Sequence, residues 1–334
     1  GEIRAQLMGQ VQIEVLRSLV LERFDTAIEV EEGRILYKET IAAPVEGVGH
    51  FEPLRHYAEV HLLLEPLPQG SGLVFDSQCS EDVLERSWQR LILTHLREKT
   101  HLGVLTGAPI TDMKITLAAG RAHLKHTEGG DFRQATYRAL RQGLMQAQSI
   151  LLEPYYHFRL SLPQAQVGRA IGDLRAMSAS FSQEQAEELA VLTGSVPVSA
   201  LGSYAMDVAA YTRGRGHLSC SPGGYAPCRN QEQIVAETGY DPEADLDNSP
   251  DSVFCAHGAG FPVKWQEVPA YMHLESCLRP PSPEAPPPRR GNLDDRELEA
   301  IMEREFGPIR RPVYQYPSPP PAIAKPEPLP PRKE

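Results

Sequence analysis

Hydrophobic positions along the chain follow two periods, and the change from one to the other outlines its elements. Apolar residues three and four positions apart predict helices over residues 11–24, 80–100 and 132–150. Alternating apolar and polar residues predict strands over residues 26–31, 35–41, 56–64 and 113–117. The first helix and its neighbouring strands cannot bury their apolar faces alone. We therefore expect a longer protein with a partner for them before Gly1.

The same reading continues into a second unit. Residues 155–162 alternate as a strand, and Pro163 begins a helical pattern that extends to 177. Further strands are predicted over residues 178–181, 190–196 and 216–220, with a helix over 201–211. This order, βαββαβ, is that of a ferredoxin-like domain. The fold class is thus α+β, with one compact α+β unit followed by a ferredoxin-like unit.

Beyond residue 225 the periodic pattern weakens. A short helix is predicted over residues 230–238, an acidic loop over 241–251, and a tight turn at 257–261. Sixteen of the 30 prolines lie between Pro280 and Pro331, so this segment is predicted to be largely irregular. Within it, residues 294–306 have the pattern of a charged amphipathic helix.

Charge changes this picture at one place. The chain carries a formal net charge of −11, which excludes a generally basic nucleic-acid coat protein. Residues 112–141 nevertheless contain six basic and three acidic side chains, and the stretch from Gly120 to Phe132 contributes Arg121, His123, Lys125 and His126. We interpret this stretch as a loop between a strand and a helix, with a composition suited to touching RNA.

Cysteine and histidine offer a weaker chemical hypothesis. The five cysteines are odd in number and irregularly spaced, which indicates reduced thiols in a cytoplasmic protein. Cys220, Cys228, Cys255 and His257 lack the paired spacing of structural zinc ligands, and no orienting acid accompanies His217 and Cys220. No run of apolar residues approaches the ~20 that a membrane span needs.

Several short motifs, in register, resemble a known family. Gly9-Gln-Val-Gln-Ile-Glu-Val-Leu16 and Ile35-Leu-Tyr-Lys-Glu-Thr-Ile41 resemble the end of domain III and the start of domain IV in elongation factor G. Three further segments, 68–73, 120–132 and 151–155, are similar to the Tet(M)/Tet(O)-type ribosomal protection proteins. The likeness covers residues 1 to about 225.

The resemblance implies a domain organisation. Residues 1–34 would end domain III, residues 35–152 would form domain IV with a left-handed βαβ crossover, and residues 153–225 would form the ferredoxin-like domain V. Residues 226–278 would be an acidic C-terminal extension, and 279–334 a Pro-rich linker, short helix and tail. The partner implied is the ribosome: small-subunit rRNA at the decoding centre for domain IV, and the large-subunit stalk base for domain V. We expect a monomer without membrane contact.

The resemblance also implies a set of residues that touch rRNA at the tip of domain IV. They are Arg121, His123, Leu124, Lys125, His126, Thr127, Glu128, Gly129 and Gly130. Where the resistance proteins carry Ser-Pro-Val-Ser, this chain has Leu-Lys-His-Thr at 124–127. Translocation-like remodelling and tetracycline release therefore both remain open.

Catalysis and cofactors are expected elsewhere. Neither a Gly-x4-Gly-Lys-Ser/Thr nor an Asn-Lys-x-Asp motif occurs in these residues, so we expect no catalytic residues and no cofactor here. GTP and Mg are expected for a full-length protein with a G domain. Two alternatives stand beside this reading: a protein-interaction module that uses the acidic and Pro-rich tail, and a Cys/His metal or thiol enzyme.

Overall fold

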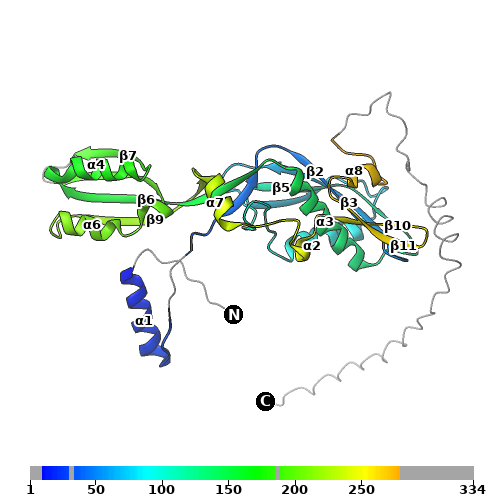
Figure 1. The fold of residues 1–334 in the computed structure, drawn as a ribbon, viewed down its shortest axis with the longest axis horizontal. Coiled ribbons are helices and arrows are strands. Elements are labelled where there is room, and N and C mark those ends of the chain that lie inside the picture. Colours follow the sequence, from blue (N-terminus) through cyan, green and yellow to red (C-terminus); the bar gives the residue numbers. More distant parts are fainter. Residues whose placement is uncertain (1–9, 30–33, 186–188, 279–334) are drawn as a thin grey trace, which may run out of the picture.

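The computed structural model describes residues 10–29, 34–185 and 189–278, and within them the chain forms two sheets (Figure 1). One sheet has six strands and lies with helices α2 (Arg86–Arg97) and α3 (Gly129–Gln146). The other has five strands and lies with α4 (Val167–Ala176) and α6 (Tyr204–Tyr211). Helix α1 (Gln10–Phe24) precedes both. No helix in these described ranges is long and apolar enough to cross a membrane.

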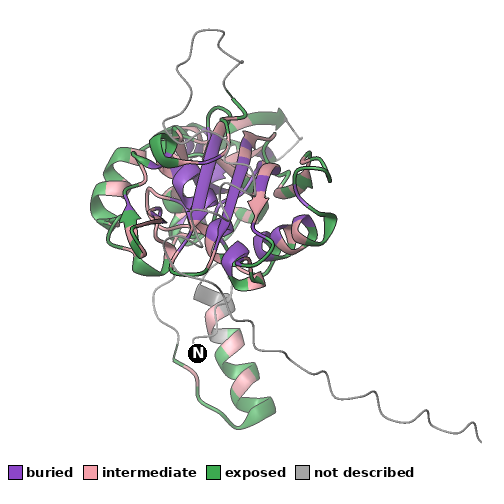
Figure 2. Cartoon of the chain, turned by 90° about the vertical axis from the view of Figure 1, so that its right-hand side faces the viewer, coloured by how far each residue is buried: buried purple, intermediate pink, exposed green. Residues whose placement is uncertain are grey.

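The six-stranded sheet has the order β11-β10-β2-β3-β5-β4. Its strands are β2 (Val45–Phe51), β3 (Ala58–Pro66), β4 (Leu73–Ser77), β5 (Met113–Ala122), β10 (Ser252–Ala256) and β11 (Ala259–Val263). β2, β3 and β5 pair antiparallel, whereas β4 and β5 run parallel because α2 carries the chain between them. Figure 2 shows that buried residues concentrate in the central strands.

The five-stranded sheet contains the ferredoxin-like unit. Its strands are β1 (Lys38–Ile41), β6 (Ser149–Pro163), β7 (Ser180–Gln185), β8 (Leu189–Pro197) and β9 (His217–Pro227). β6 pairs with β8 on one side and with β9 on the other, and β7 lies outside β8. This confirms the predicted βαββαβ order. The N-terminal part of β6 also pairs with β1, so this one long strand joins the two lobes in Figure 1.

The C-terminal extension is the main addition to the predicted fold. After α7 (Gln231–Thr238) and the short 3-10 helix η2 (Leu246–Asn248), the chain forms β10 and β11 and then α8 (Val268–Tyr271). β10 pairs in parallel with β2 through Val253 and Phe51, so the extension completes the first sheet. The sequence predicted a helix, an acidic loop and a turn here but neither strand, because each strand has five residues and too little alternation to detect.

Several predicted boundaries were wrong, for identifiable reasons. Residues 26–29 form no strand, and 30–33 lie outside the described residues, as does the helix predicted over 294–306. β2 was missed because Gly47 and Gly49 replace the apolar residues expected on one face. A Cβ at Gly49 would lie 2.0 Å from the carbonyl oxygen of Ala135, so these glycines let α3 approach the sheet closely.

This close approach gives a direct test of the fold. Gly49→Ala is expected to lower the free energy of unfolding by about 3 kcal/mol, the upper end for overpacking, because its Cβ meets backbone rather than a movable side chain. Gly130→Ala, in the first turn of α3 with open space around it, is the control and is expected to leave stability unchanged or slightly raised. Urea unfolding measures both; equal stability of the two variants would contradict the packing described.

Candidate functional site

The tip of the first sheet is shorter than the sequence predicted. Gly120, Arg121 and Ala122 belong to β5, and α3 begins at Gly129, so the connecting segment is residues 123–128. Gly120 is a packing position rather than a turn, since a Cβ there would lie 2.8 Å from Leu84 Cδ2. The expected loop over 120–132 is thereby corrected at both ends.

Hydrogen bonds hold the tip segment in one conformation. The amide nitrogens of His126 and Thr127 donate to the carbonyl oxygen of His123, over 3.2 and 3.0 Å. Thr127 Oγ1 accepts from the His123 amide and donates to the carbonyl oxygen of Tyr57, both over 2.6 Å. The Tyr57 amide in turn donates to the His126 carbonyl, over 3.2 Å. The segment is therefore fastened to the chain that leads into β3.

The start of α3 is fixed in a similar way. The amide of Glu128 donates to Asp131 Oδ2 over 2.8 Å, which satisfies one of the donors at the helix N-terminus. The other oxygen of Asp131 lies 2.9 Å from His56 Nδ1, in the connection between β2 and β3. Burial raises the pKa of Asp131, although the Glu128 amide and His56 oppose this shift. The tip thus rests on two neighbouring connections of the same sheet.

The nine residues predicted to touch rRNA divide by exposure. His123 and His126 are buried, 3% exposed each, and their rings stack 4.5 Å apart. Both therefore support the loop from within instead of presenting imidazoles to a partner. Leu124 is 85% exposed. Lys125, Glu128 and Gly130 are also exposed, and Arg121, Thr127 and Gly129 are half-buried.

Behind the tip, the sheet face opposite α3 carries a buried ladder of acidic and histidine side chains from β2, β3 and the residue after β2. We call these five residues, Glu46, His61, Glu59, His50 and Glu52, the His–Glu ladder. His61 donates from Nδ1 to Glu46 over 2.7 Å and from Nε2 to Glu59 over 3.0 Å. His50 donates from Nδ1 to Glu59 over 2.7 Å and from Nε2 to Glu52 over 3.0 Å. Every imidazole nitrogen in the ladder meets a carboxylate.

This pairing sets the charges in the ladder. Burial alone would lower the pKa of His50 and His61, but carboxylates at both nitrogens outweigh it and raise each pKa to about 9. Burial would likewise raise the pKa of Glu59, yet its bonds from His50 and His61 hold that pKa well below the usual range. Near neutral pH both histidines of the ladder are therefore imidazolium ions, and they lie among the three glutamates.

The C-terminal extension covers the ladder and supplies its remaining donors. The amides of His273 and Leu274 donate to Glu59 over 3.0 and 2.7 Å. Cys277 donates its amide to Glu46 over 3.1 Å, and Ser276 donates its hydroxyl to the same carboxylate. These contacts, with the bond from His61, overcome the effect of burial and lower the pKa of Glu46 to about 2. We call residues 272–278 the strap.

Further contacts to His50 and Tyr57 complete the layer that the extension forms over the ladder. Phe254 of β10 stacks on the His50 ring at 4.0 Å, and the Ser252 hydroxyl accepts the His50 amide over 3.0 Å. His273 Nδ1 lies 3.0 Å from the Tyr57 hydroxyl. Burial, followed by the charge on His50, lowers the pKa of His273 to about 4, so its ring is neutral. The extension is therefore an integral layer of this domain.

In the described part of the chain, one group of side chains that could hold a metal ion is formed by two ladder residues and one residue of the strap. Nitrogen or oxygen atoms of His50, Glu59 and His273 lie within 4.8 Å of one another. Both nitrogens of His50 and both oxygens of Glu59 are engaged in hydrogen bonds, which account for the approach of these side chains. The thiols considered from the sequence are dispersed instead: Cys220 lies in β9 of one sheet and Cys255 in β10 of the other.

Sequence reasoning missed the ladder, although a signal for it exists. Glu59 and His61 occupy alternate positions of a strand whose other residues are strongly apolar, and His50 and Glu52 repeat that spacing nearby. Charged residues at period two in a buried strand indicate a paired polar face. The strap residues that donate to Glu59 lie 214 and 215 positions away in the sequence, which no local pattern reveals.

Each of the two domains matches a known protein family, and the chain as a whole is similar to proteins of known name. Residues 33–148 match the family described as Elongation factor G, domain IV, and residues 150–235 match Elongation factor G C-terminus. The tetracycline resistance protein TetP of Clostridium perfringens is 32% identical over 246 residues, covering 72% of this chain and 37% of that protein. TetM from transposon Tn916 of Enterococcus faecalis is 32% identical over 217 residues, covering 64% of this chain and 34% of that protein.

A solved structure has a similar fold. The crystal structure of a protein from Thermus thermophilus superposes with a TM-score of 0.61 at 25% identity, covering 69% of this chain and 36% of that one. The chain thus spans little more than a third of the length of the relatives and of the solved protein that it matches.

The ladder predicts a specific pH dependence of stability. Because the folded pKa values of His50 and His61 are about 9, above the ordinary 6.5, their stabilisation is complete below pH 6.5 and is lost as pH rises through 9. The free energy of unfolding should fall over this window by at most about 1.4 kcal/mol per pH unit for each imidazole. Urea unfolding at a series of pH values measures the slope.

Two variants separate the ladder from other titrating groups. His61→Gln should make the slope shallower between pH 6.5 and 9, because one titrating imidazole has been removed. His157→Gln, an exposed histidine of β6, should leave the slope as it is in the parent chain. An unchanged slope in His61→Gln would show that His61 is not protonated in the folded protein.

Proposed function

The chain belongs to the elongation factor G family through its domain IV and C-terminal domain, of the type found in ribosomal protection proteins, and from this we propose that it is the ribosome-binding part of a translational GTPase. The proposal rests on both domains occurring in order, with Leu124 exposed at the tip of domain IV. GTP binding and hydrolysis, with Mg, would belong to a G domain elsewhere in a full-length protein.

We assign the contact with RNA to the exposed part of the tip, chiefly Leu124 and Lys125. The Lys125 ammonium can donate to a phosphate oxygen, and the Leu124 side chain can pack on the face of an unstacked base. Leu124 and Lys125 lie between the buried residues His123 and His126, and the Lys125 amide donates to the His123 ring. These contacts hold the backbone of the two exposed residues in place. A loop whose conformation is already set loses little entropy when it binds.

Insertion of this tip into the decoding centre is the mode of action that we propose. The C-terminal domain would then contact the large-subunit stalk base, at the other end of an elongated molecule (Figure 1). The relatives are named for tetracycline resistance, and release of the drug is one outcome of such insertion. Translocation-like remodelling is the other, because residues 124–127, Leu-Lys-His-Thr, differ from the segment expected in resistance proteins.

Ribosome pelleting with tip variants tests the proposal. Lys125→Ala should reduce the slope of log affinity against log salt by about one unit, since a single phosphate contact is removed. Leu124→Ser should weaken binding to a similar degree at every salt concentration, because an apolar contact releases no counterions. Co-sedimentation with purified ribosomes between about 50 and 200 mM salt measures both effects.

A matched control removes a charge far from the tip and outside the C-terminal domain. Lys114 lies near the start of β5, at the opposite end of this strand from the tip, and pairs with Asp76 at 2.9 Å. Lys114→Ala should retain the binding and salt slope of the parent chain. Equal losses in Lys114→Ala and Lys125→Ala, or association that is independent of salt, would contradict a specific contact at the tip.

A further inference from the structure

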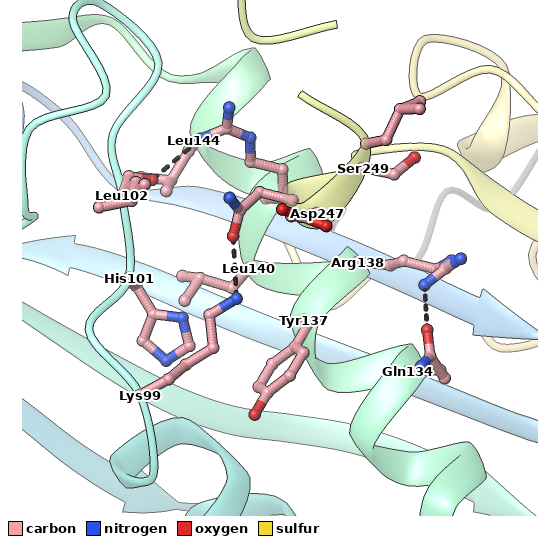
Figure 3. A pocket seen from close by; sticks show the side chains of 13 residues that line it. Lys99, His101, Leu102, Gln134, Tyr137, Arg138, Leu140, Leu144, Asp247 and Ser249 are labelled. Atoms are coloured by element: carbon pink, nitrogen blue, oxygen red, sulfur yellow. Dashed lines mark hydrogen bonds between the residues drawn. The ribbon is translucent and has the colours of Figure 1, made fainter. Parts of the chain in front are cut away.

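A cavity of about 310 Å³ lies on the helical side of domain IV, away from the His–Glu ladder (Figure 3). α3 forms one wall, the segment that follows α2 forms a second, and residues 246–249 of the extension form the third. Its volume is at the lower end of the range for small-molecule sites, about 300–1,000 Å³. The tip proposed to touch RNA contributes no residue to it.

Three cationic side chains line this cavity, and each has neutral acceptors only. Lys99 donates to the Asn248 side-chain oxygen over 2.9 Å, and Arg138 donates to the Gln134 side-chain oxygen over 2.6 Å. Arg141 donates to the carbonyl oxygens of residues 102 and 103, over 3.0 and 2.8 Å, and to a tyrosine hydroxyl. Among the described residues, no carboxylate lies within ion-pair distance of these three cations.

Burial makes this excess of positive charge costly. Arg141 is only 3% exposed, and the Nε atoms of Arg138 and Arg141 are buried without a hydrogen-bond partner in the described structure. Burial also lowers the pKa of Arg138. Two carboxylates act on these cations from a distance. Asp251 attracts Arg138 but is itself paired with Lys264 at 2.9 Å, and Asp245 attracts Arg141 but accepts the Tyr240 hydroxyl over 2.6 Å. Such a set of cations is stabilised when an anion supplies the missing charge.

We propose that this cavity binds a small ligand that carries a phosphate group. Lys99 would meet it as a compact charge, and Arg138 would offer the donors of its guanidinium that Gln134 leaves open. Phosphate fits better than a carboxylate because it carries more charge and more acceptor oxygens to share among three cations. The single acid on the wall, Asp247, is contributed by the extension.

The position of the cavity gives the ligand a structural consequence. Leu246, Asp247, Asn248 and Ser249 come from the extension, whereas the cations come from domain IV proper. A ligand held by both sides would favour the docked extension, because binding to one state stabilises that state. The amides of residues 246–249 should therefore respond to ligand, and they provide a readout that does not depend on ribosomes.

Phosphate titration followed by ¹⁵N NMR tests the site in the full chain. Inorganic phosphate should shift the resonances of residues 246–249 and the Nε–H of Arg138 in a saturable manner. Gln134→Glu keeps the size of the side chain but places a carboxylate against Arg138, and it should weaken phosphate binding about tenfold or more. Lys99→Ala should do the same by removing a charge.

The control is Arg133→Gln, on the same helix and one position from Gln134. Arg133 is outside the cavity and already pairs with Glu98 at 2.9 Å, so this variant should bind phosphate as the parent chain does. A parallel titration with a short single-stranded RNA shows whether a backbone phosphate can enter; we expect free phosphate to bind and RNA to leave these resonances unshifted. Non-saturable shifts, or equal weakening in Arg133→Gln and Gln134→Glu, would overturn the proposal.

Discussion

Domain IV of this protein is built around the buried His–Glu ladder. Isolated carboxylates and imidazolium ions in a protein interior are strongly destabilising, so each must find partners of opposite charge or hydrogen-bond donors. Within the sheet, His50 and His61 satisfy part of this requirement by bridging three glutamates. The remaining lone pairs are met only when the strap supplies its amides and the hydroxyl of Ser276. The ladder therefore makes the extension a necessary part of the domain.

The ladder also connects the extension with the tip. Tyr57 accepts the Thr127 hydroxyl at its carbonyl oxygen, and its own hydroxyl meets His273 of the strap. One fully buried residue thus touches the segment that presents Leu124 and Lys125 and the segment that covers Glu59. Tyr57 makes both contacts, one through its backbone and one through its side chain. The conformation of the tip therefore depends on the strap, which follows domain V in the chain.

The two faces of the same sheet pack against their neighbouring layers in opposite ways. Towards α3, Gly47 and Gly49 remove side chains so that helix backbone and strand backbone come into direct contact. Towards the extension, charged side chains fill the space and are paired across the layer. The extension continues around the domain to α3, where it closes the cavity lined by Lys99, Arg138 and Arg141. It thus interacts with both sides of the domain that carries the tip.

The sequence by itself determined the α+β class, the βαββαβ order, the position of the tip between a strand and a helix, and the family likeness. Periodicity and short motifs are local, and local information suffices for these features. Tertiary structure alone decided that His123 and His126 lie inside the tip while Leu124 and Lys125 lie outside, since exposure depends on what packs beneath a loop. It also decided what covers the second face of the sheet. Alternation in β3 shows that Glu59 and His61 share a face. The donors that Glu59 finds in the strap, more than 200 residues away, are set by register and by the need to satisfy buried charge.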